Sequence, residues 1–348
     1  MEMIRLTQKA LYTIDDIFGD SLNLKLDNMA PEEKEKVEEQ VKKLIKVTED
    51  GIIIQDDELL EAIKNKNLSA SLVSSFRQCP ADWVLNSFIL PKLQHIEPIY
   101  FVRGKAFHSS MEEFFQLPAE ERNNKTLGAL AYKVVQEQYP ELLKDRESMA
   151  WMKDALSGYL AGGFGIQNVE LAQIEDPETK EMKPGIELFV KGKIGNTRRN
   201  FVGFVDRLDR LPNGSLQIVD YKTGKKISPF NPSEPIGEGN SFDYWRQQLA
   251  YTMILESQGH YIGGAKLEFP VASGEVVVDV RNEKLRKQVE KYFEEVDAAL
   301  DKCVDERFFP FHGHFFCKWC GMLSQKYKTP RYGLGLSWEE VNIYLELL

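Results

Sequence analysis

The clearest pattern of apolar and polar positions in the chain predicts a β-hairpin. Apolar residues alternate with small or polar ones from Phe201 to Leu208, and a second apolar run occupies Ser215 to Tyr221. Alternation with a period of two is typical of a strand with one buried face. The residues between the runs, Pro212-Asn213-Gly214, have strong turn-forming chemistry. We therefore expect two strands joined by a tight turn.

The remaining pattern predicts both helices and strands. Apolar residues three and four positions apart indicate amphipathic helices, and short apolar runs bounded by turn residues indicate strands. Strands placed between flanking helices give an α/β fold with a mixed central sheet. The helices expected are 57–64, a helix from 68 that Pro80 interrupts, 100–115, 127–139, 149–160, 241–259 and 281–304, and the further strands are 51–54, 186–190, 264–269 and 275–280.

The first part of the chain, residues 1–66, has a different character. Pro31-Glu32-Glu33 is typical of a helix start, and apolar residues from Val37 to Ile45 follow at helical spacing. Residues 11–63 carry 15 acidic and 6 basic side chains, which is most of the net charge of −10. We expect an acidic, mostly helical extension with a packing or regulatory role. Autoinhibition, in which this acidic segment mimics a polyanionic substrate, is the alternative.

Composition places the chain among ordinary globular proteins. It has 348 residues, enough for one large or two smaller domains, and 43% of them are hydrophobic. No apolar run reaches the roughly 18 residues that span a bilayer, and the first residues lack the pattern of a signal peptide. The four cysteines argue against a disulfide framework. We expect a cytoplasmic protein, in the host cytoplasm if the source is a phage, with no membrane partner.

Basic residues outside the acidic segment gather in two runs that contain no acid. The run from Lys191 to Arg199 has four lysines and arginines, and the run from Lys318 to Arg331 also has four. Local positive patches bind phosphate whatever the total charge of the chain. Solvated basic faces are the alternative interpretation of both runs.

The predicted hairpin carries residues with catalytic chemistry. Asp206 lies on its first strand and Asp220 on its second, and Lys222 follows Asp220 by two positions, so that both side chains leave on one face. Carboxylate oxygens hold magnesium, and a bound metal activates water and offsets charge on a scissile phosphate. A lysine then orients the water or stabilises the developing charge. The pattern indicates metal-assisted phosphodiester hydrolysis, although a salt-bridged strand end gives the same tripeptide.

With their surroundings, GFVDRLDR and IVDYKTGK, these residues resemble the PD-(D/E)xK nuclease superfamily, in particular its RecB-like exonuclease branch, which includes CRISPR-associated and phage nucleases. The similarity covers residues 68–325 in five ordered blocks. It implies a restriction-endonuclease-like α/β core, with a mixed central β-sheet flanked by helices, over residues 67–330. Residues 331–348 would be a C-terminal tail. It also implies magnesium or manganese as the cofactor.

The resemblance assigns metal ligands beyond the hairpin. A Gly-x-x-x-His helix supplies a metal-binding histidine in this family, and Gly104 with His108 fits that pattern. His108, Asp206 and Asp220 would then bind the metal, with the backbone carbonyl of Tyr221 nearby. Relatives often carry a glutamate on the preceding strand, which would make Glu187 a further acid of the site. A structural histidine and a solvated glutamate are the alternatives for these two positions.

A Gln-x-x-x-Tyr pattern follows the hairpin. Gln247 and Tyr251 lie four residues apart and therefore on one face of the expected helix. This pair marks the RecB-like branch and would hold substrate beside the catalytic centre. Next to it, Arg246 offers a phosphate contact and Trp245 offers base stacking. Ordinary amphipathic filler is the alternative for such a pair.

Cysteines suggest a second metal site. Cys317 and Cys320 form a C-x-x-C with metal-binding spacing. The resemblance implies a [4Fe–4S] cluster held by one cysteine before the core and three after it, and Cys79 fits the first place. No cysteine follows Cys320, so Cys303 or a nearby histidine would have to supply the fourth ligand. A zinc site, or thiols without any metal, remain alternatives.

Together these residues predict a metal-dependent DNA exonuclease that acts on DNA ends or single strands in recombination, repair or phage DNA metabolism. Asp206, Asp220 and Lys222 would be the catalytic residues, and DNA the partner, with recombination or replication proteins as further partners. Two alternatives stand beside this prediction. One is a non-catalytic DNA-binding or assembly subunit with a nuclease-like fold, and the other is a nuclease of CRISPR adaptation.

Overall fold

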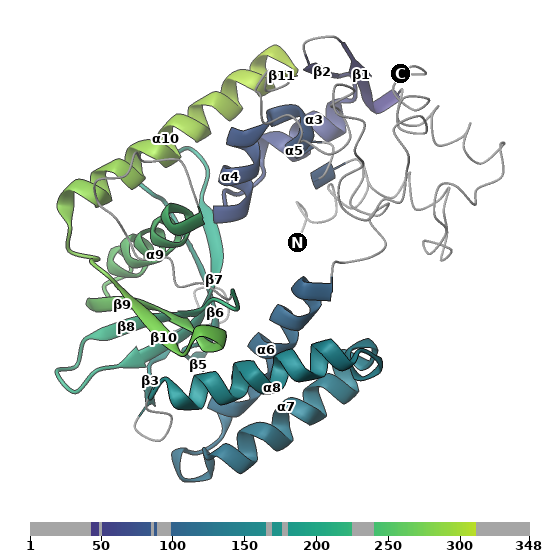
Figure 1. Ribbon diagram of the computed structural model, residues 1–348. Coiled ribbons are helices and arrows are strands. Elements are labelled where there is room, and N and C mark those ends of the chain that lie inside the picture. Colours follow the sequence, from purple (N-terminus) through teal and green to yellow (C-terminus); the bar gives the residue numbers. More distant parts are fainter. Residues whose placement is uncertain are drawn as a thin grey trace. The chain divides into compact units, whose positions relative to one another are not determined.

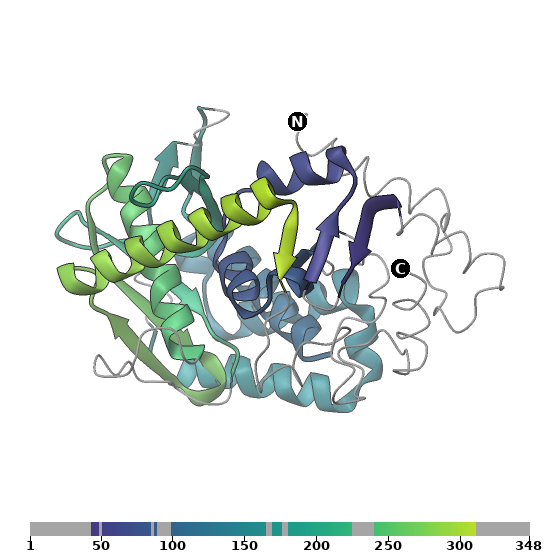
Figure 2. The same cartoon turned by 90° about the horizontal axis from the view of Figure 1, so that it is seen from above.

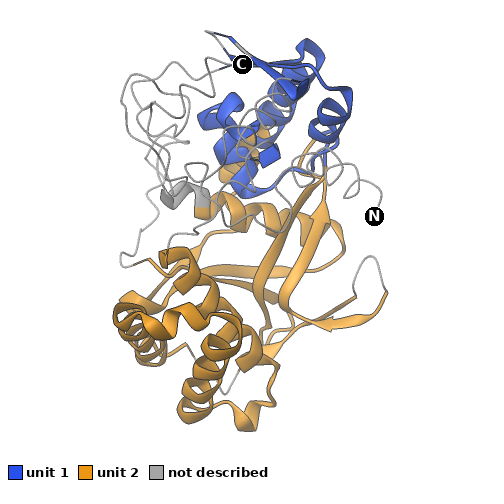
Figure 3. Ribbon diagram, turned by 90° about the vertical axis from the view of Figure 1, so that its right-hand side faces the viewer, with its two compact units in different colours: residues 1–98, 197–199, 293–348 blue, residues 99–196, 200–292 orange. Residues whose placement is uncertain are grey.

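The computed structural model (Figure 1) describes residues 43–48, 51–84, 87–88, 99–164, 169–175, 180–224 and 240–310. The chain divides into two compact units, shown in different colours in Figure 3. Unit 1 takes its described residues from 1–98, 197–199 and 293–348, and unit 2 comprises 99–196 and 200–292. No helix within the described ranges has both the length and the apolar character needed to cross a membrane.

Unit 2 contains a six-stranded mixed sheet, which confirms the α/β fold expected from the sequence. The order is β10-β9-β8-β7-β3, and β6 also pairs with β7. Among the described strand pairs of this sheet, only β8–β9 is parallel. The strands are β3 (Glu170–Leu171), β6 (Ile186–Gly192), β7 (Phe201–Arg210), β8 (Leu216–Tyr221), β9 (Ile262–Phe269) and β10 (Gly274–Val278).

The predicted hairpin is strands β7 and β8. They pair antiparallel from Arg210–Leu216 to Arg207–Val219. Gly214 has a φ of 83°, a left-handed conformation that glycine adopts without strain. The Asn213 side chain accepts a hydrogen bond from the Ser215 backbone N–H at 3.0 Å, which fixes the turn.

Helices cover both sides of this sheet. Buried aromatic and aliphatic side chains of α6, α7 and α8 form one apolar core together with Val219 and Tyr221 of β8. Helix α9 packs against β6, β7 and β9, and Figure 1 shows it on the other side of the sheet from α8. The helices are α6 (Ile99–Gln116), α7 (Asn124–Gln138), α8 (Arg146–Ala161), α9 (Asn240–Ser257) and α10 (Glu283–Glu306), and the boundary between the units falls inside α10.

Short elements connect this framework. Gly158 of α8 lies so close to the 3-10 helix η6 that an added Cβ would be 2.0 Å from the Pro270 carbonyl oxygen. Glycine is therefore required for this close approach. The short elements are η4 (Ala119–Glu121), η5 (Pro140–Lys144), η6 (Pro270–Ala272) and the two-stranded pair β4 (Gln173–Glu175) and β5 (Met182–Pro184).

Unit 1 is built on a three-stranded antiparallel sheet in the order β1-β2-β11, and its strands lie side by side in Figure 2. The prediction that Ile45 continues a helix is wrong, because it begins β1 and pairs with Ile54. Leu44, of the same predicted face, is helical, and residues 37–42 lie outside the described residues. The elements are β1 (Ile45–Val47), β2 (Gly51–Ile54), β11 (Phe308–Pro310), α3 (Asp57–Lys64), α4 (Ala70–Gln78) and α5 (Pro80–Val84).

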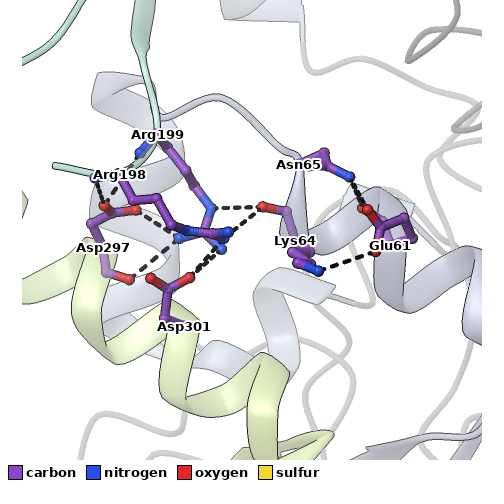
Figure 4. Close-up of polar contacts among 7 residues, drawn as sticks. All are labelled: Glu61, Lys64, Asn65, Arg198, Arg199, Asp297 and Asp301. Atoms are coloured by element: carbon purple, nitrogen blue, oxygen red, sulfur yellow. Dashed lines mark hydrogen bonds and ion pairs between the residues drawn. The ribbon is translucent and has the colours of Figure 1, made fainter.

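The first basic run ends in unit 1 and is not a free basic surface. Arg199 is buried and lies 2.6 Å from the Asp297 carboxylate, and its second nitrogen lies 2.8 Å from Asp301 (Figure 4). Arg198 also pairs with Asp301, at 2.7 Å. Both guanidinium groups donate to the backbone carbonyl of Lys64. These two arginines therefore join segments of unit 1, and the second basic run, 318–331, lies outside the described residues.

Candidate active site

The site forms in unit 2, at the point where strands β7 and β8 stop pairing. The last residues that pair between the two strands are Arg207 and Val219. Beyond them, the backbone N–H of Tyr221 donates to the carboxylate of Asp206 at 2.8 Å instead of to a strand. The carboxylate of Asp206 is thereby fixed beside the end of β8, because a charge-assisted hydrogen bond of this length holds its orientation.

Three candidate metal ligands converge at Asp206. One donor atom from each of His108, Glu187 and Asp206 lies within 4.8 Å of the other two. The Nδ1 atom of His108, on α6, is 3.4 Å from Oδ2 of Asp206. Glu187 reaches the group from β6. Sequence reasoning had named all three residues, and it had left Glu187 open between a metal ligand and a solvated acid.

The backbone at Glu187 is strained. Its φ is 43°, in the left-handed region that a residue with a side chain rarely adopts, and it lies within a strand. The neighbouring pairs Ile186–Arg207 and Leu188–Val205 remain in register on either side. Such outliers gather at functional sites, where the surrounding structure maintains them. No pattern in the sequence could reveal this feature.

A second group extends from Asp220 to α9. Nζ of Lys222 lies 2.6 Å from Asp220 and donates to the side-chain carbonyl of Gln247 at 3.2 Å. The amide of Gln247 donates in turn to the hydroxyl of Tyr251 at 3.0 Å. Lys222 also lies over the ring of Tyr244, 4.6 Å from its centre. The structure thus brings together the Asp-x-Lys and Gln-x-x-x-Tyr residues that the sequence placed 25 positions apart.

Gly203 makes room for Tyr251, the last residue in this series of contacts. Tyr251 is 2% exposed, and its ring packs against Phe201 of β7. A Cβ added at Gly203 would lie 2.7 Å from the Tyr251 hydroxyl. Gly203 therefore permits the close contact between β7 and α9. Sequence reasoning did not single it out, although a glycine inside a strand pattern is a recognised signal of close approach.

Burial and mutual repulsion raise the pKa values of two acids. Burial raises the pKa of Asp220 to about 6, with Asp206 adding to the rise and Lys222 opposing it. Burial and the charge of Asp206 raise the pKa of Glu187 to about 7. Like charges held together disfavour ionisation, and a cation placed among them would restore it. Asp220 and Glu187 therefore have too little positive charge around them to be fully ionised.

The basic residues of the site show the opposite balance. Burial disfavours a charged His108, but the carboxylate of Asp206 outweighs this and raises its pKa to about 9. Burial also opposes a charge on Lys222, yet Asp220 and Asp206 hold its pKa above the ordinary value. For Asp206, burial favours the neutral form, while His108 keeps the pKa below its usual range. Binding of a divalent cation would therefore displace a proton from His108.

Arg246, expected to contact a substrate phosphate, is buried in the structure. Its side chain is 1% exposed, and the guanidinium lies over the ring of Tyr292, 4.2 Å from the ring centre. Trp245, expected to stack on a base, is also buried. Burial of both side chains argues against the direct substrate contacts expected of them. Substrate binding by Gln247 and Tyr251 stays a prediction.

A buried arginine, which sequence reasoning missed, holds residues next to the site through hydrogen bonds and ion pairs. Arg207 follows Asp206 on β7 and is 1% exposed, with its guanidinium 4.3 Å from the centre of the Phe115 ring. Arg207 donates a hydrogen bond to the hydroxyl of Tyr221. It thereby holds Tyr221, whose backbone N–H orients Asp206. The available signal was the second acid in DRLD, two positions after the arginine. Arg207 contacts Asp209 (2.8 and 3.0 Å), Glu268 (3.3 Å) and the hydroxyls of Tyr159 (3.0 Å) and Tyr221 (2.6 Å).

A pocket of about 730 Å³ opens at the metal-ligand group. His108, Glu187 and Asp206 contribute to its lining, and most of the remaining lining comes from α6. A cavity of this size accommodates a nucleotide-sized group. The candidate ligands are therefore accessible to a substrate.

The cysteine site lies largely outside the described residues, because Cys317 and Cys320 fall in the range 311–348. Cys79 and Cys303 are both buried in unit 1. Burial raises the pKa of the Cys303 thiol to about 11. The cluster and zinc alternatives stay predictions.

Comparison with known proteins agrees with this geometry. A sequence model of the PD-(D/E)XK nuclease superfamily matches residues 67–325, most of the chain and all of the site residues of unit 2 described above. The chain therefore belongs to the PD-(D/E)XK nuclease superfamily. Membership indicates a nuclease that uses divalent metal ions and acts on DNA. No curated protein matches the chain significantly.

Proposed function

We propose that the protein is a metal-dependent DNA exonuclease of the RecB-like type that hydrolyses phosphodiester bonds at DNA ends or in single strands. Recombination, repair and phage DNA metabolism are the settings that need this activity. The observation that carries the proposal is the pairing of Lys222 with Asp220 at 2.6 Å beside the His108–Glu187–Asp206 group. Such a combination provides both metal ligands and a cation for the reacting phosphate.

The donor set fits magnesium or manganese. Two carboxylates with one imidazole give mostly hard oxygen donors, and manganese accepts the nitrogen readily. Asp220 and the carbonyl of Tyr221 complete the proposed ligand set. A divalent cation held there supplies an activated water and offsets the charge on the scissile phosphate. The raised pKa values of Glu187 and Asp220 support this assignment, since both acids would ionise fully beside a cation.

The side chains of the protein then have separate tasks. The ammonium group of Lys222 donates a hydrogen bond toward the attacking water or the developing charge. The carboxylate of Asp220 keeps Lys222 ionised. Gln247 accepts from Lys222 and fixes its direction, while Tyr251 holds the amide of Gln247. Tyr251 is therefore a positioning residue, because it is buried and acts through Gln247.

The test is a cleavage time course with DNA labelled at either end, as single strands and as duplexes, with magnesium or with a chelator. We expect progressive shortening from an end that stops in chelator and in the Asp220→Ala variant. Asp220→Ala should also bind metal more weakly, since it loses a proposed ligand. A folded wild-type protein that binds DNA but cleaves none of these substrates with magnesium or manganese would support a non-catalytic DNA-binding subunit instead.

A further inference from the structure

Two aromatic side chains lie exposed at the start of α6. Tyr100 and Phe101 are each 52% exposed, and their ring centres lie 4.6 Å apart. Tyr261 is another exposed aromatic of unit 2, and the guanidinium of Arg281 lies over its ring at 4.8 Å. Exposed apolar surface often marks a binding site, so the position of the pair relative to the active site matters.

The pair lines the same pocket as the candidate metal ligands. Tyr100 and Phe101 contribute to its lining together with His108 and Asp206. On a helix, positions 100, 104 and 108 lie on one stripe, because residues four apart share a face. The intermediate residue is Gly104, which leaves this stripe without a side chain between the aromatic pair and the histidine. A Cβ added at Gly104 would lie 3.3 Å from Oγ1 of Thr223, so Thr223 borders this stretch of the pocket that the aromatic rings and the site share.

We propose that Tyr100 and Phe101 form a stacking site for an unpaired base of single-stranded DNA whose backbone enters the active site. This inference rests on the proposed nuclease function and assigns its substrate class. Aromatic side chains bind single strands by stacking on successive bases, and every base offers a face. Bases inside a duplex are already stacked on both sides, so a duplex can occupy this site only where its end frays.

Charge and spacing agree with this occupant. Lys105, exposed on the same lining, places a cation along the path of the backbone phosphates. Seven or eight residues separate the rings from His108, which is about 12 Å along a helix that rises 1.5 Å per residue. With roughly 3.4 Å per nucleotide in a stacked strand, the base at the aromatic pair lies within about four nucleotides of the scissile bond.

The test measures the affinity of the full-length protein for fluorescent single-stranded oligonucleotides, with calcium replacing magnesium to prevent cleavage. A single abasic position is moved along the strand. We expect one position, within about four nucleotides of the cleaved bond, to lower affinity about tenfold, the size of one stacking contact. Tyr100→Ala and Phe101→Ala should each lower the affinity for intact DNA by a similar factor. With the sensitive base already removed, neither variant should weaken binding further.

Tyr261→Ala is the matched control, because Tyr261 is an exposed aromatic outside the pocket. It should bind like the wild type. An abasic scan without a sensitive position, or variants that keep full affinity for intact DNA, would overturn the inference. Variants that melt at lower temperature but keep base-dependent binding would show that the protein itself covers the pair, which also overturns it. Binding that depends on the aromatic pair in a protein without cleavage would leave the stacking site standing and refute only the nuclease function.

Discussion

Glu187 combines two unfavourable features at a single position. Its backbone is strained, with a φ of 43°, and its pKa is raised to about 7 by burial and by Asp206. A folded-state pKa above the unfolded value means that the native protein holds more protons between about pH 4.5 and 7. The free energy of unfolding therefore falls as the pH rises through this interval. A protein keeps such a residue when a ligand compensates for it, and the proposed cation does so.

We predict that Glu187→Gln is more stable than the wild type at pH 8 in chelator, by a few degrees of melting temperature for a unit of this size. The gain should shrink toward pH 5, where Glu187 of the wild type is itself protonated. Added manganese should raise the melting temperature of the wild type more than that of the variant, which has lost a ligand. Thermal unfolding at the two pH values checks this. A variant that is less stable than the wild type at pH 8 without metal would contradict it.

Residues of the candidate site were predictable where their placement depends on residues close to them in the sequence. Asp206, Asp220 and Lys222 could be found because strand alternation and a turn fix their relative placement. The burial of Arg246 was not predictable, because the sequence of a helix buried on several sides gives no sign of whether its one arginine reaches the surface. Arg207 escaped notice because its partners, from Tyr159 to Glu268, are distant in sequence.

At the scale of elements, Arg207 ties β7 to β8, β9 and α8. It makes ion pairs with Asp209 and Glu268, and it bonds the hydroxyls of Tyr159 and Tyr221. Lys266 of β9 also lies 2.7 Å from Glu268. Removing one member of such a buried network leaves the opposite charges unpaired, which is more destabilising than losing the contact alone.

We predict that Arg207→Met lowers the free energy of unfolding by about 3–5 kcal/mol, as expected for breaking a buried pair. Arg210→Met is the matched control on the same strand, because Arg210 is exposed and its pair with Glu170 spans 3.5 Å. Exposed pairs contribute about 0–1 kcal/mol. Urea unfolding of both variants checks the prediction, and equal losses would show that the buried network is not a stabilising centre.

Helices and strands were predictable wherever one apolar face dominates. The expected β2 and α3 have the bounds that the structure shows. Ile45 was misassigned because Leu44 and Ile45 fit a helical face equally well, and the strand pairing with Ile54 is decided by tertiary contact. Helical periodicity alone cannot distinguish the two cases for a short apolar run.

At the scale of the molecule, contacts between residues distant in sequence hold the segments of unit 1 together. Asp297 of α10 accepts backbone N–H groups from Arg198 and Arg199, and it pairs with the Arg199 guanidinium (Figure 4). The Lys64 carbonyl accepts from both arginines. The Asp297 and Arg199 side chains are each 4% exposed, so the pair is desolvated on both sides. All of the candidate catalytic residues belong to unit 2.

We therefore predict that Asp297→Ala destabilises the protein by about 3–5 kcal/mol, because it leaves Arg199 buried without this carboxylate. The cleavage rate per folded molecule should stay unchanged at temperatures where the variant is folded. Asp301→Ala, whose side chain is 34% exposed, should have a smaller effect. Unfolding and activity assays on the same samples check this. A variant of normal stability with lost cleavage would assign Asp297 to the reaction instead.

The most direct test of the central claim compares two lysines, Lys222 just after β8 and Lys266 in the neighbouring β9, by single-turnover cleavage of labelled DNA with saturating magnesium. Lys222 pairs with Asp220 at 2.6 Å, and Lys266 pairs with Glu268 at 2.7 Å. Only Lys222 belongs to the proposed site. Lys222→Ala should cleave about 100- to 1000-fold more slowly while binding DNA and metal, as expected for losing one electrostatic donor. Lys266→Ala should cleave close to the wild-type rate, whereas wild-type cleavage by Lys222→Ala would contradict the site assigned to this protein.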